Sequence, residues 1–275
     1  MKFNIITTAF NSAETILNCY ASIERQNFKD IKWIIIDGKS EDKTVKIIKE
    51  NKKKIITSLT SEKDKGLYYG YNKGLKKINA NNNTIINILD SDNEYIDKNV
   101  LKYVHNIFKK FDVDIVFSDI IYVTKKNKIL RFWKSKPFKK YVYKKNLLYI
   151  YKNFSLVDYV FGWTMPLPSI FIKSNLAKKI GLFETRYRVC SDYNWSLRVG
   201  FCKDVKIAYI NKVLVKMRVG GVSNRFSNLV RIKLEDFIII FNFLKKKNLI
   251  LAFFLSPIII LFKNLRKIPQ FFLRG

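Results

Sequence analysis

Short apolar runs alternate with amphipathic stretches over the first 120 residues, and this alternation constrains the fold more than any other feature. β-Branched runs at Phe3–Thr7, Trp33–Ile36 and Thr84–Leu89 predict strands buried on both faces. Shorter candidates lie at Ile55–Ile56 and Asp114–Phe117. The carboxyl ends of such strands are where ligands bind in open α/β sheets, so polar residues directly after them carry the most information.

Four helical patterns separate these runs. The first has capping-box spacing at Asn11 and Glu14 and an apolar face that begins at Ile16. The others are expected around Val45–Ile48, Gly66–Ile78 and Val100–Phe111. A β-α-β-α-β order predicts the α/β class, with a mainly parallel central sheet and helices on both faces.

Composition narrows the class of protein. With 275 residues, 48% of them hydrophobic, the chain is long enough for one large domain or for one domain with an extension. A net charge of +30 predicts an anionic partner, although an AT-rich genome would also enrich Lys, Asn and Ile. Three distant cysteines and one histidine exclude a disulfide framework, a zinc cluster and a histidine-dependent triad. We expect a cytoplasmic protein, since no signal-peptide pattern is visible.

Carboxylates follow three of the predicted strands. Asp37 ends the second run, Asp64 follows the third, and Asp90 and Asp92 follow the fourth. Carboxylates gathered at one sheet edge repel each other unless a cation or hydrogen-bond donors lie among them. An Asp-x-Asp pair suits Mg²⁺ or Mn²⁺, which take oxygen ligands and leave positions for diphosphate oxygens. The alternative is an ordinary acidic turn.

The ordered motifs resemble those of family 2 glycosyltransferases, closest to the bacterial type that builds colanic-acid and other surface polysaccharides. The resemblance covers residues 3 to about 120 and continues more weakly to Gly220-Gly221-Val222-Ser223. It implies the GT-A fold and an inverting sugar transfer that depends on a divalent cation, Mn²⁺ or Mg²⁺. The motifs are Thr7–Ser12, Asp37–Thr44, Ser61–Tyr68 with Asn72-Lys73-Gly74, Leu89–Asp92, Gly181–Glu184 and Ser191–Tyr193.

The resemblance also implies roles for individual residues. Asp37 would contact the nucleotide base, Asp92 would bind the metal ion, and Asp90 would assist it. The remaining residues implied to bind the nucleotide sugar are Thr8, Ala9, Phe10, Asn11, Gly38, Asp64, Lys65 and Ser91, together with Asp90. Many relatives have an acidic residue where this chain has Asn93, which puts the metal ligand set in question.

Asp192 is the candidate catalytic base. An inverting transfer needs a carboxylate that takes the proton of the acceptor hydroxyl, and the family's base lies in a similar acidic motif. Relatives often have Glu-Asp where this chain has Ser191-Asp192. The alternative is that Asp192 only caps a helix over 193–199.

The rest of the chain suggests contact with an acceptor or a membrane. Residues 120–157 hold 11 Lys or Arg, nine aromatics and no acid. The apolar run Leu249–Phe262, which we expect Ser256-Pro257 to interrupt, is too short to span a bilayer. With basic flanks it fits an interfacial or re-entrant segment, or alternatively a helix packed on the domain. We expect a GT-A domain over 1–225, divided at 120/121, and a C-terminal helical extension over 226–275.

Together these features predict a glycosyltransferase that uses a nucleotide sugar, in particular a UDP-sugar. The acceptor would be a glycan or lipid-linked glycan at the inner face of the cytoplasmic membrane, with peripheral contact to anionic lipid. Two alternatives remain. Residues 120–157 interleave cations with aromatics, as binders of single-stranded nucleic acid do. The acids at positions 37, 64, 90 and 92 would then repel the phosphates. Asn93 and the missing Glu before Asp192 also allow an inactive, membrane-associated relative.

Overall fold

The computed structural model describes residues 1–51, 55–81, 83–154, 156–220, 228–246 and 248–268. The helices are α1 (Ile16–Glu24), α2 (Thr44–Glu50), α3 (Leu67–Lys76), α4 (Val100–Phe111), α5 (Leu156–Val160), α6 (Ser174–Ile180), α7 (Ser191–Gly200), α8 (Leu229–Lys245) and α9 (Leu249–Leu265). The strands are β1 (Lys2–Ala9), β2 (Ile31–Asp37), β3 (Ile56–Ser61), β4 (Thr84–Ile88), β5 (Asn93–Tyr95), β6 (Ile115–Val123), β7 (Ile129–Trp133), β8 (Tyr143–Lys145), β9 (Leu148–Lys152), β10 (Phe171–Lys173) and β11 (Lys206–Arg218).

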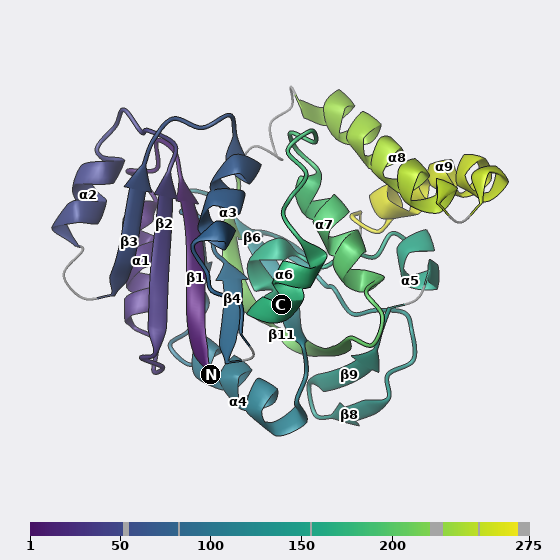
Figure 1. Cartoon of the computed structure of the whole chain (residues 1–275), viewed down its shortest axis with the longest axis horizontal. Coiled ribbons are helices and arrows are strands. Elements are labelled where there is room, and N and C mark those ends of the chain that lie inside the picture. The colour runs from purple at the N-terminus through teal and green to yellow at the C-terminus, as the bar shows by residue number, and fades with distance from the viewer. Residues whose placement is uncertain (52–54, 82, 155, 221–227, 247, 269–275) are drawn as a thin grey trace.

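One twisted sheet runs through the described part of the chain in the order β3-β2-β1-β4-β10-β6-β11-β9-β8. Its first four strands are parallel, with β1 between β2 and β4. β10 then runs antiparallel to both β4 and β6, and β11 runs parallel to β6. The carboxyl ends of β1 to β4 therefore meet at one edge, toward the top of Figure 1. The predicted α/β class is confirmed.

The sheet separates two apolar cores. One holds side chains of α1 and α4, including Cys19 and Phe108. The other holds side chains of α3, α6 and α7, and α8 and α9 add Ile239, Leu244 and Ile259 to it. In Figure 1, α3, α6 and α7 lie in front of the sheet and α1 lies behind it. Helices on both faces explain why the parallel strands are continuous apolar runs.

The elements predicted in the first 120 residues are all present, with different limits. β3 extends to Ser61, well beyond the expected Ile55–Ile56. It is an edge strand whose side chains are mostly only partly buried, so its sequence lacks the continuous apolar run of the inner strands. The capping box was wrong. α1 begins at Ile16 without a side-chain cap, and Glu14 forms an ion pair with Lys125 instead. Asn11 has a left-handed backbone, and its side chain accepts a hydrogen bond from the Glu41 amide.

The C-terminal residues form a helical hairpin, α8 and α9, at the upper right of Figure 1. The expectation that Ser256-Pro257 interrupts the apolar run was wrong, because α9 continues through Pro257. The Ser256 hydroxyl donates to the Ala252 carbonyl within the same turn (2.6 Å). One face of α9, with Ala252 and Ile259, is buried, so the packed-helix alternative describes that face. None of the described helices is both long and apolar enough to cross a bilayer.

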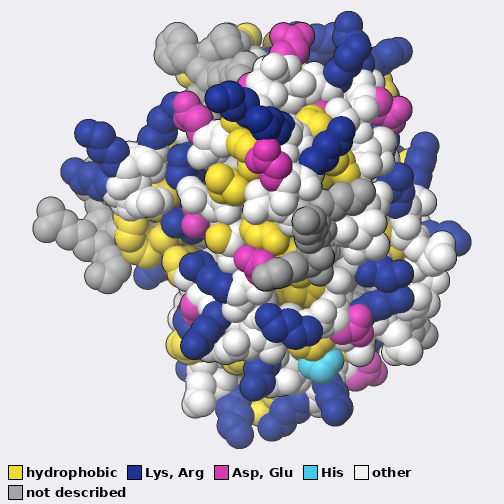
Figure 2. All heavy atoms as spheres, turned by 90° about the vertical axis from the view of Figure 1, so that its left-hand side faces the viewer, with side chains coloured by type: hydrophobic (Ala, Val, Ile, Leu, Met, Phe, Trp, Pro, Cys, Tyr) yellow, Lys and Arg dark blue, Asp and Glu magenta, His cyan; other side chains and the backbone are white. Residues whose placement is uncertain are grey.

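One of the two expected domain limits falls inside a strand, and the other falls outside the described residues. The division at 120/121 lies inside β6, the strand that joins the two halves of the sheet. The limit at 225/226, and residues 221–223 of the weakly matching motif, lie outside the described residues. Charge is spread rather than gathered on the face that Figure 2 shows, where Lys and Arg side chains are scattered among apolar and acidic ones. The division of the chain into these parts stays a prediction.

Two glycines let α3 lie directly on β1. A Cβ at Gly70 would be 2.9 Å from Cγ2 of Thr8, and a Cβ at Gly74 would be 2.5 Å from Cγ2 of Ile6. Both distances are shorter than real Cβ contacts, so no other residue fits without a shift. The glycines thus set how far the first turns of α3 reach over the sheet edge.

We predict that Gly74→Ala destabilises the protein, although alanine is the better helix former by about 1 kcal/mol. The added methyl overpacks the contact with Ile6, which typically costs about 1–3 kcal/mol. Thermal unfolding monitored by circular dichroism should show a lower Tm. Lys77→Ala, at the C-cap of the same helix, is the control and should leave the Tm nearly unchanged. An unchanged or higher Tm for Gly74→Ala would contradict this account of the packing.

Candidate active site

Asp90 ties together the ends of β1 and β4. Its Oδ1 accepts a hydrogen bond from the Thr8 hydroxyl (2.5 Å), and its Oδ2 accepts one from the Tyr71 hydroxyl (2.6 Å). The Ser91 amide donates to the Thr8 carbonyl (3.2 Å), and the Ser91 hydroxyl contacts that of Ser12 (2.8 Å). Burial raises the pKa of Asp90, and the two hydroxyl donors oppose that shift. Both oxygens of this carboxylate are already engaged.

Asp92 is in the opposite situation. No side chain of the described residues donates a hydrogen bond to its carboxylate, although it is partly buried. Burial, followed by the nearby negative charge of Asp90, raises the pKa of Asp92 to about 7, and Arg218 offsets part of this. A desolvated carboxylate beside a second one is stabilised by a cation. Asp92 is therefore the better metal ligand of the pair.

The residues fit a divalent ion whose coordination the substrate completes. Among the described residues no group of three Asp, Glu, His or Cys side chains is close enough to hold a metal ion. Mg²⁺-type ions need no such group, since they bind through one or two carboxylates plus waters and substrate phosphates. Asn93 does not replace a third carboxylate here. Asn93 is fully buried at the start of β5, and its side-chain amide has no hydrogen-bond partner in the described part of the chain.

Asp37 is buried at the end of β2, where hydroxyl and amide donors surround it. Its Oδ1 accepts from the Ser40 hydroxyl (2.5 Å), and its Oδ2 accepts from the Ser40 amide (3.0 Å) and the Ser61 hydroxyl (2.6 Å). This carboxylate therefore links the loop after β2 to the end of β3. Its contact with a nucleotide base stays a prediction.

The other residues expected to bind the nucleotide lie along the same edge. The Gly38 amide donates to the Ala9 carbonyl (2.9 Å), and the Asn11 amide donates to the Ser40 hydroxyl (2.8 Å). The Phe10 ring is 63% exposed and lies against Gly38, whose Cα also faces the Asp64 carboxylate. An exposed aromatic ring at the carboxyl end of a parallel sheet is suited to contact a planar base.

Asp192 lies in the first turn of α7. Cys190 occupies the N-cap position, but Oδ1 of Asp192 accepts a hydrogen bond from the Tyr193 amide (2.8 Å), so Asp192 also supports the helix end. Its Oδ1 lies 3.0 Å from the Tyr68 hydroxyl, which also lies 2.6 Å from the Val189 carbonyl. Burial raises the pKa of Asp192 above the ordinary range, although hydrogen bonds from Tyr193 and Tyr68 oppose the shift. A raised pKa makes a stronger base.

One helix connects the two carboxylate sites. Tyr68 and Tyr71 are three residues apart on α3, so they share one face, with ring centroids 5.7 Å apart. Tyr71 contacts Asp90 and Tyr68 contacts Asp192. Asp192 is close enough to Asp90 that its charge contributes to the raised pKa of Asp90. The expected metal side and the expected base therefore belong to one site.

Glu235 of α8 fixes the loop that leads into Asp192. Its carboxylate accepts three backbone hydrogen bonds, from the amides of Arg188, Val189 and Cys190, each 2.9 Å long. Glu235 is buried, so these charge-assisted bonds are shielded from water. The C-terminal hairpin thus holds the candidate base, Asp192, in place.

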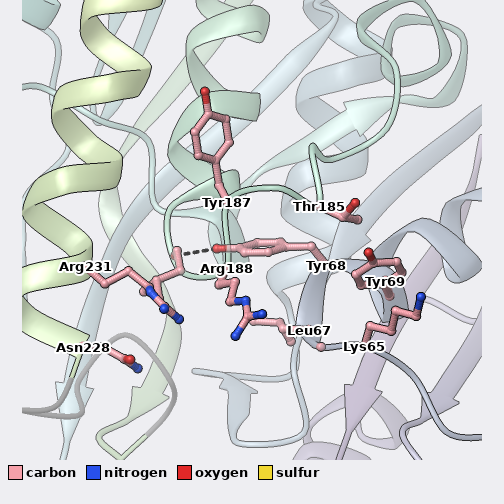
Figure 3. Close-up of a pocket in the computed structure, with 11 residues that line it drawn as sticks. Lys65, Leu67, Tyr68, Tyr69, Thr185, Tyr187, Arg188, Asn228 and Arg231 are labelled. Carbon is pink, nitrogen blue, oxygen red and sulfur yellow. Dashed lines mark hydrogen bonds between the residues drawn. The ribbon is translucent and has the colours of Figure 1, made fainter.

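Two pockets open beside this site. The larger, about 310 Å³, lies between the start of α3, the 185–189 loop and the start of α8. Figure 3 shows the guanidinium groups of Arg188 and Arg231 on the same side of it, with Tyr68 hydrogen-bonded across its back wall. Lys65 adds a third cation. The smaller, about 190 Å³, has Asp192 in its wall.

Comparison with known proteins decides the family. The family model described as glycosyl transferase family 2 matches residues 4–167, more than half of the chain. The chain belongs to this family. It is therefore an enzyme of the transferase class, which favours this interpretation over nucleic-acid binding.

Relatives of this glycosyltransferase are distant. An uncharacterized glycosyltransferase of Methanocaldococcus jannaschii is 26% identical over 236 residues, which is 85% of this chain and 76% of that protein. The cholesterol galactosyltransferase of Borreliella burgdorferi is 28% identical over 246 residues, again 85% of this chain. The chain spans 65% of that relative's length.

Solved structures confirm the GT-A fold. S. aureus TarS 1–349 superposes with a TM-score of 0.64 at 17% identity, covering 89% of this chain and 66% of that one. The mannosyltransferase PcManGT from Pyrobaculum calidifontis, in complex with GDP-Man and Mn²⁺, superposes with a TM-score of 0.60 at 15% identity. That match covers 96% of this chain and 73% of the other.

Sequence reasoning missed three residues of the site: Tyr68, Tyr71 and Glu235. Tyr68 ends one matched motif and Tyr71 lies just before the next, but their partners are 124 and 19 residues away along the chain. Glu235 had a detectable signal. Glu235 and Asp236 are the two acids of the last 50 residues, adjacent in an otherwise apolar and basic segment. An isolated acidic pair in such a segment indicates buried partners.

We predict that Glu235→Ala lowers the free energy of unfolding by about 2 kcal/mol or more, because two buried amides lose their acceptor at about 1–3 kcal/mol each and the partly buried Arg188 amide loses its own. The glycosyltransferase should also lose turnover while its affinity for the donor nucleotide changes little. Urea unfolding and nucleotide titration measure the two effects. Glu50→Ala removes an exposed carboxylate from α2 and serves as the control. Wild-type stability in Glu235→Ala would contradict the role of Glu235.

Proposed function

We propose that this glycosyltransferase moves a sugar with inversion from a nucleoside diphosphate sugar, specifically a UDP-sugar, to a glycan or lipid-linked glycan. One observation carries the proposal: two neighbouring tyrosines of α3 connect two carboxylates. Tyr71 hydrogen-bonds to Asp90, and Tyr68 hydrogen-bonds to Asp192. A donor-side carboxylate pair and a separate buried base are the two parts that such a transfer needs.

Each group has a distinct task. Asp92, with Asp90 behind it, would hold a divalent ion that supplies Lewis-acid stabilisation of the leaving diphosphate. Phe10, Asp37 and Asp64 would surround the nucleoside. Asp192 would take the proton of the acceptor hydroxyl as that oxygen bonds to the anomeric carbon and the bond to the diphosphate breaks. General-base help of this kind is worth roughly 10²–10⁴-fold.

Comparisons support a nucleotide-sugar donor. TarS 1–349 has been solved with UDP and with UDP-GlcNAc, and PcManGT with GDP-Man. Because these structures differ in base, the choice of UDP rests on the sequence resemblance and needs a direct measurement. The role in surface polysaccharide assembly rests on the same resemblance.

The α8–α9 hairpin supports an acceptor at a membrane. Apolar side chains are exposed at helical spacing along both helices, and Lys245 and Lys246 lie at the C-terminal end of α8. Ile250 is 68% exposed and Phe254 is 70% exposed. An exposed apolar helix face with basic neighbours binds at the interface of an anionic bilayer. The other exposed members are Val230, Leu234, Phe237, Ile238, Phe253, Ile258, Leu261 and Leu265.

We predict that Asp92→Asn and Asp192→Asn separate the two halves of the site. Asp92→Asn should abolish the Mn²⁺-dependent part of UDP binding, whereas Asp192→Asn should bind UDP normally and lose about 10²-fold or more in turnover. Calorimetric titration of UDP and of GDP, each with and without Mn²⁺, measures binding. UDP release from a UDP-sugar in the presence of a membrane lipid fraction measures turnover. Equal loss of nucleotide binding in both variants would contradict the assignment.

We predict that the double variant Ile250→Ser, Phe254→Ser binds anionic vesicles about 100-fold more weakly or worse, because each apolar side chain that enters the bilayer contributes about 1.5–3 kcal/mol. Co-sedimentation with phosphatidylglycerol vesicles measures this. Leu17→Ser, which replaces an exposed apolar residue of α1, is the control. Unchanged sedimentation of the double variant would show that the hairpin does not contact lipid.

A further inference from the structure

The smaller pocket lies under the C-terminal end of α9. Its walls include Tyr122 and Trp133 of β6 and β7, Asp192 and Tyr193 of α7, and the residues at the end of α9. The 162–168 segment, β11 and α8 also contribute to the lining. Its volume of about 190 Å³ is below the roughly 300–1,000 Å³ of pockets that enclose a whole drug-sized ligand. It can therefore hold a head group, while the rest of a longer molecule stays outside.

Cationic side chains outnumber carboxylates in the lining of this pocket. The Lys263 ammonium pairs with Asp236 (2.5 Å) and lies 3.5 Å from the centre of the Tyr193 ring. The other charged groups in the wall are Asp192 and the cations Arg131, Arg266 and Lys267. These three cations and Asp192 line the same wall, and the charges of Asp158 and Asp119 also act on Arg266.

Two of these cations show the imbalance directly. Nη1 of Arg266 is buried without a hydrogen-bond acceptor among the described residues, while Nη2 donates to the Lys136 carbonyl (3.0 Å). The pKa of Lys267 is lowered to about 8, first by burial and then by the like charge of Lys263, with smaller contributions from Lys233 and Arg131 that Asp236 opposes. A bound anion would satisfy both groups.

We propose that this pocket binds a phosphate group of the acceptor, through Arg266 and Lys267, and so presents the acceptor's sugar hydroxyl to Asp192. The inference rests on the proposed function for the role of Asp192, whereas the anion site stands on the charges alone. The aromatic wall of Tyr122 and Trp133 is suited to the apolar face of a sugar ring. Arg131 stacks over Tyr122, 4.2 Å from its ring centre, and extends the cationic wall.

The same turn of α9 indicates where the phosphate comes from. Lys263, Arg266 and Lys267 line the pocket, while Leu265 and Ile268 are about half exposed on the other side. A phosphate bound here lies at the depth of lipid head groups, with an apolar surface beside it for its chain. The ligand is therefore a lipid phosphate that carries the acceptor, rather than a free phosphate.

The test compares Lys267→Gln with Lys246→Gln. The two variants lose the same charge from the same hairpin, but Lys246 is exposed and does not line the pocket. Binding of the full chain is measured to neutral vesicles that contain a polyprenyl phosphate, to vesicles with an equal charge of phosphatidylglycerol, and to inorganic diphosphate in solution. UDP binding with Mn²⁺ is measured in parallel.

Wild type and Lys246→Gln should bind polyprenyl phosphate vesicles more tightly than phosphatidylglycerol vesicles. Lys267→Gln should lose about 10-fold or more of the affinity for polyprenyl phosphate, as expected for one charge-assisted hydrogen bond, and keep its UDP affinity. Lys267→Arg, which retains the charge, should restore binding and shows that any loss in Lys267→Gln is not misfolding.

Three results would overturn the inference. An equal loss in Lys246→Gln would mean that binding is general attraction to a charged surface. Loss of UDP affinity in Lys267→Gln would mean that the pocket holds the donor's diphosphate. Binding of inorganic diphosphate as tight as that of the lipid phosphate would mean a free phosphate site. Absence of UDP binding in wild type would instead reject the proposed function, and leave the vesicle comparison to decide the anion site.

Discussion

The site depends on the contact between α3 and the end of β1. Gly70 and Gly74 remove the side chains that would separate the helix from Thr8 and Ile6. With the helix this close, the Tyr71 hydroxyl reaches Asp90, and the Tyr68 hydroxyl lies between Val189 and Asp192. Hydroxyl donors stabilise both buried carboxylates, and Lys263 adds a nearby positive charge at Asp192. One helix thereby sets the spacing between Asp90 and Asp192, the residues proposed for the donor side and for the base.

The C-terminal hairpin is part of this arrangement rather than an appendage. Glu235 holds the amides before Asp192, and the pair formed by Asp236 and Lys263 joins α8 to α9 next to the Tyr193 ring. Removing one partner of a buried pair is costly because the other charge stays behind unpaired. One face of the hairpin therefore shapes the base and its pocket, and the opposite face exposes Ile250 and Phe254. Contact with a lipid surface would bring that surface to the acceptor side of the site.

Net charge acts on this enzyme at two scales. A surplus of +30 gives the protein a positive long-range field that favours the approach of anions in general, and basic side chains are spread over the face in Figure 2. Specific chemistry needs charges that are fixed and partly dehydrated, and these are few. Asp92, Asp192 and Lys267 each have a pKa displaced first by burial. Because burial makes a charged group more costly, Asp92 would gain from a bound cation and Asp192 from a proton. Lys267 would gain from a bound anion for the same reason.

Sequence alone determined the α/β order, the helix over 100–111 and the acids at strand ends, because apolar periodicity reports local burial directly. It failed where local and distant partners compete. Asn11 had a capping-box partner in Glu14 but bonds to Glu41, and Pro257 stayed helical because packing of α9 outweighs its missing amide. Tertiary structure alone decided that Tyr68 meets Asp192 and that Glu235 meets the 188–190 loop. Hydrogen bonds between residues 45 to 124 positions apart leave no periodic trace in a sequence, since only folding brings their atoms within reach.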